Sequence, residues 1–404
     1  MSVPYWKRNL WLLWLSQLLG FMGYSAALPF IPLFMKQKYN IIDDKELGLY
    51  VSAFYFITTF ALALVSPIWG IIADRYGRKL MLVRAFFGNA VVFPLLAFAP
   101  TIGILLVFRA IASVFSGSIN AAQTLIVSNT PEEHQGYALG VFSTSVWCGN
   151  MMGLVFGGVT SHIFTYQTSF IACGVLYFIG GIMTLWVHEN FSPVKKERQS
   201  KFSQFKVLSK AGLIVAGLFV MVGILRNIET PFLPLKVVEI VGENKAGLMT
   251  GILGACAAAG GVISGFLLGK LADRMRPLQL MLPVLALSGA MLAGQGASKA
   301  MWLLMLCRFL AFVAAGGIEP ILQVILSRVT PQENRGGAFG MAMTARMFGI
   351  MLSSVIGGFI QQIWNVNGVF IAGGILFAAL IPLVVCAFRK IAVYCPESMQ
   401  AGKR

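Results

Sequence analysis

Six ionisable side chains stand inside long apolar stretches of the sequence, and they are the first candidates for chemistry. They are two glutamates and four arginines: Arg109, Arg226, Glu229, Arg308, Glu319 and Arg346. If these stretches cross a membrane, each charge at a helix centre costs roughly 2.5 to 3.5 kcal/mol, even on a lenient insertion scale. We therefore expect the six side chains to pair with one another or to face a watery cavity.

The two glutamates are the candidate proton carriers. A partly desolvated carboxylate beside an arginine can exchange a proton, and its neutralisation changes which packing of the helices is favoured. Arg226 and Glu229 are three residues apart, so on a helix they share a face and can interact directly. Glu319 is predicted to pair with Arg346. For each glutamate, the alternative is a permanent ion pair that only fixes the register of two helices.

The composition identifies an integral membrane protein. Hydrophobic residues make up 57% of the 404 residues and charged residues 11%, with a mean hydropathy of +0.79. A helix needs about 20 apolar residues to cross roughly 30 Å of hydrocarbon. Twelve such spans are predicted, at about 8–34, 46–72, 80–99, 102–127, 136–162, 166–188, 208–236, 244–270, 278–297, 300–326, 336–362 and 366–390. Residue 1 is taken as the start of the mature protein, because the first apolar run is too long for a signal peptide.

One basic linker divides the twelve spans into two halves. We predict an N-terminal six-helix bundle at 1–188, a linker at 189–207 and a C-terminal six-helix bundle at 208–404. Of the 31 lysines and arginines, 21 fall on one side of the membrane, six on the other and four within spans. Cationic loops stay in the cytoplasm, so both termini and the linker are predicted to be cytoplasmic.

Several function classes find no support in the residues. The net charge of +16 comes from basic residues scattered between apolar runs, which is unlike a nucleic-acid-binding surface. The six cysteines form no CxxC pair and have no histidine at ligand spacing, so neither a metal site nor a disulfide is indicated. No nucleophile constellation or nucleotide-binding loop is found, and we expect the chain not to be an enzyme.

The two halves repeat one another. The stretch TPEEHQGYALG at 130–140 aligns with TPQENRGGAFG at 330–340, at an offset of 200. Upstream the offset is 199, and it places Arg109 on Arg308. LPFIPLF, which begins at Leu28, likewise echoes TPFLPLK. Duplicated membrane bundles usually place a substrate site between the repeats and work by rocking one half against the other.

A charged loop, GIIADRYGRK at 70–79, follows the second span. Gly70 would let that span approach a neighbouring helix closely, and Gly77 would permit a tight turn at positive φ. Asp74 could face the positive N-terminal end of a helix from the other half. An ordinary basic loop that obeys topology rules is the alternative.

This loop matches a known signature, G-x-x-x-D-R-x-G-R-K, at six positions: Gly70, Asp74, Arg75, Gly77, Arg78 and Lys79. Over essentially its whole length the chain resembles a major facilitator superfamily transporter, and more narrowly the 12-helix drug:proton antiporter branch. The resemblance implies an all-α integral membrane fold with twelve transmembrane helices in two pseudo-symmetric six-helix bundles. It also implies that the loop latches the cytoplasmic side. The second copy keeps Asp273 and Arg274 but has Arg276 and Pro277 at the following positions, so the latch is expected to be asymmetric.

A second signature lies in the fifth span, where GNMMGLVFGG resembles the antiporter pattern G-x-x-x-G-P-x-x-G-G. Gly149, Gly153, Gly157 and Gly158 match, and Leu154 replaces the proline, which removes a kink. Glycines four residues apart open a flat face on which another helix can pack closely. Generic transmembrane packing is the other interpretation.

In this family, spans 1, 4, 7 and 10 line the cavity, and five of the six ionisable residues lie on them. Arg109, with Gly117 eight residues later, resembles the helix 4 signature associated with proton coupling. The residues assigned to proton coupling are Glu229, Glu319, Arg109, Arg226 and Arg346. The substrate-binding candidates are Tyr24, Asn120, Asn227, Arg308 and Phe312.

The resemblance implies a proton-coupled secondary transporter in a bacterial cytoplasmic (inner) membrane. It would export small lipophilic or cationic compounds, drugs included, by alternating access. We expect a monomer with no cofactor and no metal, whose partners are a small-molecule substrate, protons and the lipid bilayer, and not nucleic acid. The alternative is a specific carrier, exporter or importer, of one metabolite, sugar or siderophore. The four arginines would suit an anionic solute.

Overall fold

The computed structural model describes residues 5–189, 210–275, 277–331 and 335–394, which are helical apart from short connections. Ten helices in these ranges are long and apolar enough to cross a membrane. One of them, α15, is two helices joined at the non-helical Asn365, and the shorter apolar helix α9 forms a further span. The described chain therefore has the twelve spans that hydropathy predicts.

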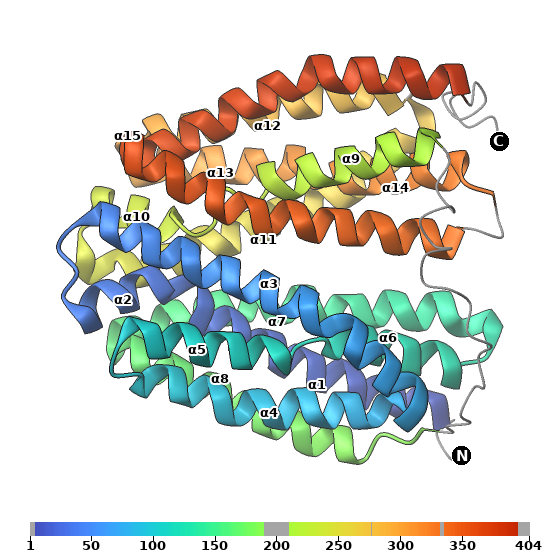
Figure 1. Cartoon of the computed structure of the whole chain (residues 1–404), viewed down its shortest axis with the longest axis horizontal. Coiled ribbons are helices and arrows are strands. Elements are labelled where there is room, and N and C mark those ends of the chain that lie inside the picture. The colour runs from blue at the N-terminus through green and yellow to red at the C-terminus, as the bar shows by residue number, and fades with distance from the viewer. Residues whose placement is uncertain (1–4, 190–209, 276, 332–334, 395–404) are drawn as a thin grey trace. The chain divides into compact units, whose positions relative to one another are not determined.

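The elements follow one another along the chain as labelled in Figure 1. They are α1 (Tyr5–Ala27), the 3-10 turn η1 (Leu28–Phe30), α2 (Ile31–Tyr39), α3 (Asp44–Tyr76), α4 (Arg78–Phe98), α5 (Ile102–Val114), α6 (Ser118–Asn129), α7 (Glu132–Ile163), α8 (Tyr166–Leu185), α9 (Lys210–Leu225), α10 (Leu233–Val241), α11 (Glu243–Arg274), α12 (Pro277–Ala297), α13 (Met301–Ala315), α14 (Ile318–Val329) and α15 (Arg335–Tyr394).

The chain forms two compact units. Unit 1 takes in residues 1–43, 53–195 and 241–255, and unit 2 takes in the rest. The first turns of α3 therefore belong with unit 2, and the first turns of α11 with unit 1. The domain boundaries expected from the basic linker stay a prediction, and residues 190–209 of that region lie outside the described residues.

Spans 1 and 7 are interrupted at equivalent places. In span 1, the 3-10 turn η1 separates α1 from α2, and Pro29 lies within it. In span 7, residues 226–232 separate α9 from α10, and this segment contains Pro231. A proline lacks the N–H that an α-helix needs and clashes with the preceding turn, so the repeated P-x-x-P sequence accounts for both breaks.

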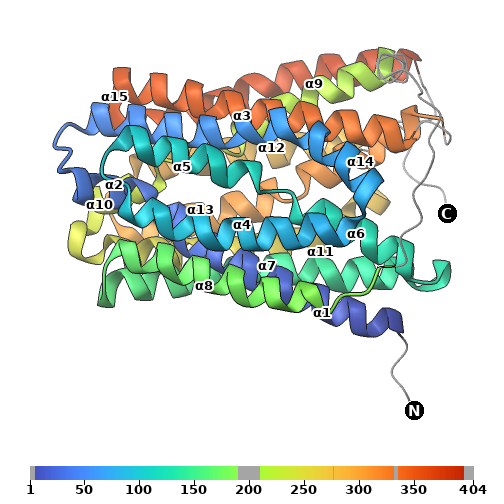
Figure 2. The same cartoon turned by 60° about the horizontal axis from the view of Figure 1, so that its bottom comes forward.

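Spans 4 and 10 are also interrupted. Residues 115–117, which end at Gly117 with a φ of +105°, separate α5 from α6, and two glycines separate α13 from α14. Figure 2 shows α5 and α6 alongside α4. Two side chains of α4 bond the carbonyl groups that the break in span 4 leaves free. The Arg84 Nη2 donates to Ser116 O at 2.8 Å, and Asn89 Nδ2 donates to Phe115 O at 3.4 Å. Backbone freed inside a membrane is tolerated only where the protein satisfies it in this way.

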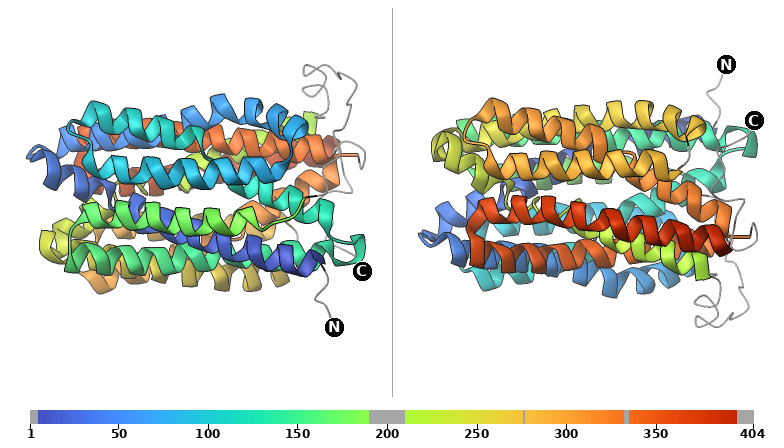
Figure 3. Two further views of the ribbon diagram at one scale, coloured as in Figure 1. Left: turned by 90° about the horizontal axis from the view of Figure 1, so that it is seen from below. Right: turned by 90° about the horizontal axis from the view of Figure 1, so that it is seen from above.

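Glycines bring α7 against α1 (Figures 1 and 3). A Cβ atom at Gly149, Gly153 or Gly157 would collide with a backbone carbonyl oxygen of α1, and Gly153 faces Met22. The glycines four apart therefore form a flat face whose partner within unit 1 is α1. Gly158, in the same helix, lies against the first turns of α11.

The second repeat also packs two helices through a glycine face. Gly349 and Gly357 of α15 stand at the positions of Gly149 and Gly157, and they face the carbonyl oxygens of Val220 and Ile228. Helix α15 thereby packs against α9 within unit 2. The two repeats therefore share a packing scheme as well as a sequence pattern.

We expect Gly153→Ala to lower the free energy of unfolding by roughly 1 to 3 kcal/mol, because the added methyl overpacks the contact with Met22. Thermal unfolding in detergent measures the effect. Gly140→Ala is the matched control, since Gly140 lies in the same helix with nothing within 4 Å of its Cβ position. Equal unfolding temperatures for the two variants would show that the glycine face does not hold α7 on α1.

Candidate functional site

The tightest ion pair in the described spans joins Glu229 to Arg308. Glu229 lies in the non-helical segment between α9 and α10, and Arg308 lies in α13. The Arg308 Nη1 donates to Glu229 Oε1 at 2.6 Å, and the two side chains are only 6% and 5% exposed. Removing either partner would leave a buried, unpaired charge, which is strongly unfavourable.

Two neutral groups complete the surroundings of Arg308. The Gln295 Oε1 of α12 accepts from the same Nη1 at 3.4 Å. The Phe312 ring centroid is 4.7 Å from Arg308 Cζ, a distance at which a cation and an aromatic ring attract each other. Arg308 is thus held by a carboxylate, an amide and a ring from three different segments of unit 2.

A small cavity of about 30 Å³ adjoins this pair. Four residues predicted for the site line it: Arg226, Glu229, Arg308 and Phe312. Three buried atoms beside it have no hydrogen-bond partner among the described residues: Glu229 Oε2, Gln295 Nε2 and Arg308 Nε. Such a volume suits about one water molecule. The cavity therefore has a few unpartnered polar atoms in a mostly apolar lining, and it is too small for a drug.

A second charge cluster lies in the same unit. The Glu319 Oε2 is 3.4 Å from Arg346 Nε and 3.6 Å from Arg226 Nη1. The ion pair expected between Glu319 and Arg346 is present, and Arg226 joins it. One carboxylate is thus paired with two guanidinium groups, so the cluster has one net positive charge.

The direct contact expected between Arg226 and Glu229 is wrong. Helix α9 ends at Leu225, so the two residues stand in a non-helical turn and do not share a helix face. Arg226 pairs with Glu319, whereas Glu229 pairs with Arg308. Because Arg226 and Glu229 both stand in the break of span 7, they contact different partners.

In unit 1, Arg109 occupies the position equivalent to Arg308. It is 3% exposed, and its Nε donates to Thr58 Oγ1 at 2.7 Å. Its Cζ lies 5.2 to 6.0 Å from the ring centroids of Tyr24, Phe54 and Phe93. Within the part of the chain that the structure describes, no carboxylate forms an ion pair with it. Aromatic faces stabilise this buried cation instead.

Two other substrate candidates are less enclosed. Asn120 of α6 is exposed. The Asn227 Nδ2 donates to Gly223 O at 2.9 Å, so this amide satisfies the end of α9. Their part in substrate binding stays a prediction, as does that of Tyr24, which contributes to the aromatic surroundings of Arg109.

The stretch predicted as a charged loop, 70–79, is helical except at one residue, because α3 continues to Tyr76 and α4 begins at Arg78. Only the turn expected at Gly77 is present. Gly77 has a φ of +93° and precedes α4. Sequence analysis missed Glu189, whose carboxylate oxygens accept from the backbone N–H groups of Arg78 and Lys79, both at 2.8 Å. A carboxylate at a helix N-terminus is favourable, and the lack of an acidic residue in the first turn of α4 was the available signal.

Other parts of this loop prediction are corrected or left open. The close helix approach expected at Gly70 is wrong for the described residues, because nothing lies within 4 Å of its Cβ position. Arg75 stacks on the neighbouring Tyr76 ring at 5.3 Å. The side chains of Asp74, Asp273 and Arg274 lie outside the described residues, so the cytoplasmic latch stays a prediction.

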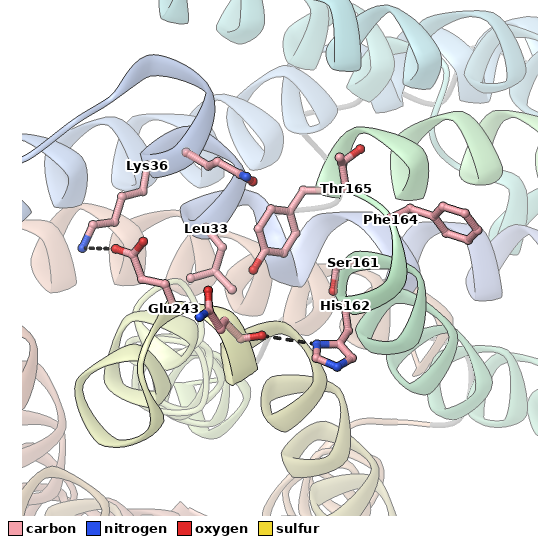
Figure 4. Close-up of a pocket in the computed structure, with 10 residues that line it drawn as sticks. Leu33, Lys36, Ser161, His162, Phe164, Thr165 and Glu243 are labelled. Carbon is pink, nitrogen blue, oxygen red and sulfur yellow. Dashed lines mark hydrogen bonds and ion pairs between the residues drawn. The ribbon is translucent and has the colours of Figure 1, made fainter.

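A larger pocket of about 370 Å³ lies in unit 1, where α2, α7, α8 and α11 begin or end (Figure 4). Its Lys36 and Glu243 form an ion pair at 3.2 Å, and His162 Nδ1 is 3.3 Å from Asn244 O. None of the residues predicted for the site lines it. We therefore take the smaller, buried cluster around Glu229 as the candidate functional site.

Comparison with known proteins agrees with this architecture. The family model described as Major Facilitator Superfamily matches residues 13–299 and 251–394. The chain belongs to the major facilitator superfamily.

Relatives within this superfamily match almost the whole chain. Multidrug resistance protein MdtG of Proteus mirabilis is 31% identical over 371 residues, which cover 90% of this chain and 92% of that protein. Its counterpart in Salmonella typhimurium is 29% identical over 395 residues, covering 96% and 98%.

Solved structures show the same major facilitator fold. The nucleoside transporter NupG superposes with a TM-score of 0.74 at 15% identity, covering 94% of this chain and 99% of that one. A bacterial homolog of the human lysosomal transporter Spinster gives a TM-score of 0.75 at 14% identity and covers both chains fully.

We expect the Glu229–Arg308 pair to show strong energetic coupling. Glu229→Leu or Arg308→Leu alone should each lower the free energy of unfolding by about 3 to 5 kcal/mol, because each leaves a buried charge, and the double variant should recover much of the loss. Unfolding in detergent provides the double-mutant cycle. The same cycle on Lys36 and Glu243, where Glu243 is 68% exposed, should give a coupling below about 1 kcal/mol. Additive losses at Glu229 and Arg308 would contradict the assignment.

Proposed function

We propose that the chain is a proton-coupled secondary transporter that exports small lipophilic or cationic compounds, drugs included, by alternating access. The support is membership of the major facilitator superfamily, together with relatives near 30% identity that are named multidrug resistance proteins. We further propose a monomer in a bacterial cytoplasmic membrane, with cytoplasmic termini, protons as the coupling ion, no cofactor and no enzymatic activity.

The buried carboxylate of Glu229 is the observation that carries this proposal. One of its oxygens is bound to Arg308, and the other, Oε2, has no partner among the described residues and adjoins the small cavity. A proton arriving at Oε2 would neutralise Glu229 and weaken its attraction to Arg308. The protonation state of Glu229 would thereby change the contacts between the α9–α10 segment and α13. Proton-coupled transport needs such a link between the charge of a residue and the packing of helices.

Glu319 is the second candidate carrier, and its surroundings favour it less. Two guanidinium groups face its carboxylate, so protonation would leave Arg226 and Arg346 together with no compensating charge. We assign the transported proton to Glu229 and a charge-balancing role to Glu319.

One proton provides enough energy for useful export. Moving a unit charge through about 100 mV releases roughly 2.3 kcal/mol. Since about 1.4 kcal/mol corresponds to a tenfold ratio, one proton would sustain a gradient of some tens-fold for a neutral solute.

Replacing Glu229 tests the coupling. In proteoliposomes with an imposed pH gradient, ethidium should dissipate the gradient through the wild-type protein, and Glu229→Gln should abolish this because a neutral amide cannot exchange the proton. Glu319→Gln is the matched comparison and should keep coupled transport. Undiminished coupling in Glu229→Gln would remove Glu229 from the mechanism, and loss only in Glu319→Gln would transfer the role.

A specific carrier of an anionic solute is the second candidate function. Arginines outnumber glutamates in the spans by four to two, and Arg109 has no carboxylate partner among the described residues. A panel of chemically varied compounds distinguishes the two functions by thermal stabilisation of the protein in detergent. Stabilisation by several unrelated lipophilic cations supports the multidrug exporter, whereas stabilisation by one anionic compound alone supports the specific carrier.

A further inference from the structure

Gln295 is a buried polar residue that the proton-binding step described so far does not use. It lies in α12 with 0% exposure, inside a helix that is otherwise mostly apolar. Its Oε1 accepts weakly from Arg308 Nη1 at 3.4 Å, and its Nε2 has no partner among the described residues. Both Gln295 and Glu229 line the small cavity.

Packing alone does not account for a glutamine at this position. A buried donor without a partner is unfavourable, and an apolar side chain of similar size would avoid that cost. Among the described residues, the one polar contact of the Gln295 side chain is directed at the cation that also binds Glu229. The amide therefore stands where a second acceptor for Arg308 would be needed.

Arg308 needs this second acceptor when Glu229 takes up a proton. The carboxylate then becomes a neutral acid, so the charge attraction that holds Arg308 Nη1 at 2.6 Å is lost and only a weaker hydrogen bond to a carbonyl oxygen is left. Arg308 stays charged, and a buried guanidinium without a counter-charge is strongly unfavourable unless other acceptors compensate. Gln295 Oε1 already faces the same nitrogen, so a small movement of the guanidinium would turn the weak contact into a full hydrogen bond.

We propose that Gln295 is a positioning residue for proton exchange: it is the standby acceptor for Arg308 while Glu229 is protonated. This inference rests on the proposed function, in which Glu229 carries the proton. Gln295 touches neither the proton nor the substrate and acts through Arg308. By stabilising the protonated state, it sets the pH range in which Glu229 exchanges its proton.

The charged groups around Glu229 are few. Arg226 and Arg308 line the cavity with it, and Glu319 reaches it only through Arg226. The other helices that line the cavity contribute uncharged side chains: Leu225 from α9, Ser288, Leu292 and Gln295 from α12, Ala311, Phe312 and Ala315 from α13, and Phe377 from α15. A substitution at position 295 therefore changes a single partner of the Glu229–Arg308 pair.

Two substitutions should act in opposite directions. Gln295→Leu removes the standby acceptor, so the protonated state is disfavoured and Glu229 should bind its proton only at lower pH. Gln295→Glu supplies a carboxylate that neutralises Arg308 and repels the charged form of Glu229, so the proton should bind at higher pH. Shifts of about one pH unit are expected, since one unit corresponds to 1.36 kcal/mol and one hydrogen bond to a charged group is of that order.

Infrared difference spectroscopy of the full-length protein in detergent measures this directly. The carboxylic-acid band that disappears in Glu229→Gln reports protonation of Glu229, and its midpoint is followed against pH without any substrate. The double variant Glu229→Gln, Gln295→Glu corrects for the band of the added carboxylate. Ser288→Ala is the matched control, because Ser288 lines the same cavity but donates to Val284 O of its own helix at 2.7 Å. It should keep the wild-type midpoint.

Opposite shifts for the two variants support the proposal. Unchanged midpoints, or shifts in the same direction, overturn it. If Gln295→Leu does not fold, the shift of Gln295→Glu against Ser288→Ala alone decides. Failure of the proposed function has a different signature, because Glu229 would then titrate in the spectrum while proton-coupled ethidium transport persisted in Glu229→Gln.

Discussion

A charge inside a membrane-spanning bundle must find its partner within the protein, and the Glu229–Arg308 ion pair is where unit 2 meets this requirement most tightly. The pair depends on a broken helix. If span 7 were continuous, Glu229 would follow the same helical register as Arg226, but the non-helical segment lets it reach α13 instead. A break of this kind is tolerated only inside the protein, since lipid cannot satisfy the freed backbone groups. The helix break and the buried charge therefore both require a position inside the protein, away from lipid.

The two repeats share a scaffold and differ in their chemistry. Both carry glycine faces that bring a long helix onto the first span of the repeat, and both have an arginine at the same position, Arg109 in one and Arg308 in the other. In the aligned P-x-x-P segments, Ala27 occupies the place of Glu229, and unit 1 surrounds its arginine with aromatic rings. A ring attracts a cation but takes up no proton. Duplication thus accounts for the shared framework, and the two repeats differ in whether a carboxylate or aromatic rings surround the arginine.

Hydropathy predicts the spans well because the thickness of the hydrocarbon fixes the length of an apolar helix, so twelve spans could be read from the sequence. It predicts the site less well because pairing depends on where helices break. The P-x-x-P sequence around Pro231 was the signal that residues 226–232 leave the helix, and treating them as helical produced the wrong partner for Arg226. Gln295 escaped notice for another reason: a neutral amide in an apolar run has no distinctive spacing, and only its contact with Arg308 distinguishes it.

The size of the cavity constrains how proton and solute can be coupled. A volume of about 30 Å³ excludes a drug-sized compound, whose sites usually measure 300 to 1,000 Å³. If Glu229 carries the proton as proposed, a solute would not displace that proton by entering this cavity. The link must pass through a group that adjoins both the cavity and more open surroundings. Arg226 is such a group, because it lines the cavity and also pairs with Glu319 in a cluster whose side chains are 17 to 28% exposed. Under the proposed function, a solute that contacts Arg226 would change the charge facing Glu229, and protonation of Glu229 would change the charge that Arg226 presents to the solute. Such a coupling would be reciprocal, as linkage between two sites requires.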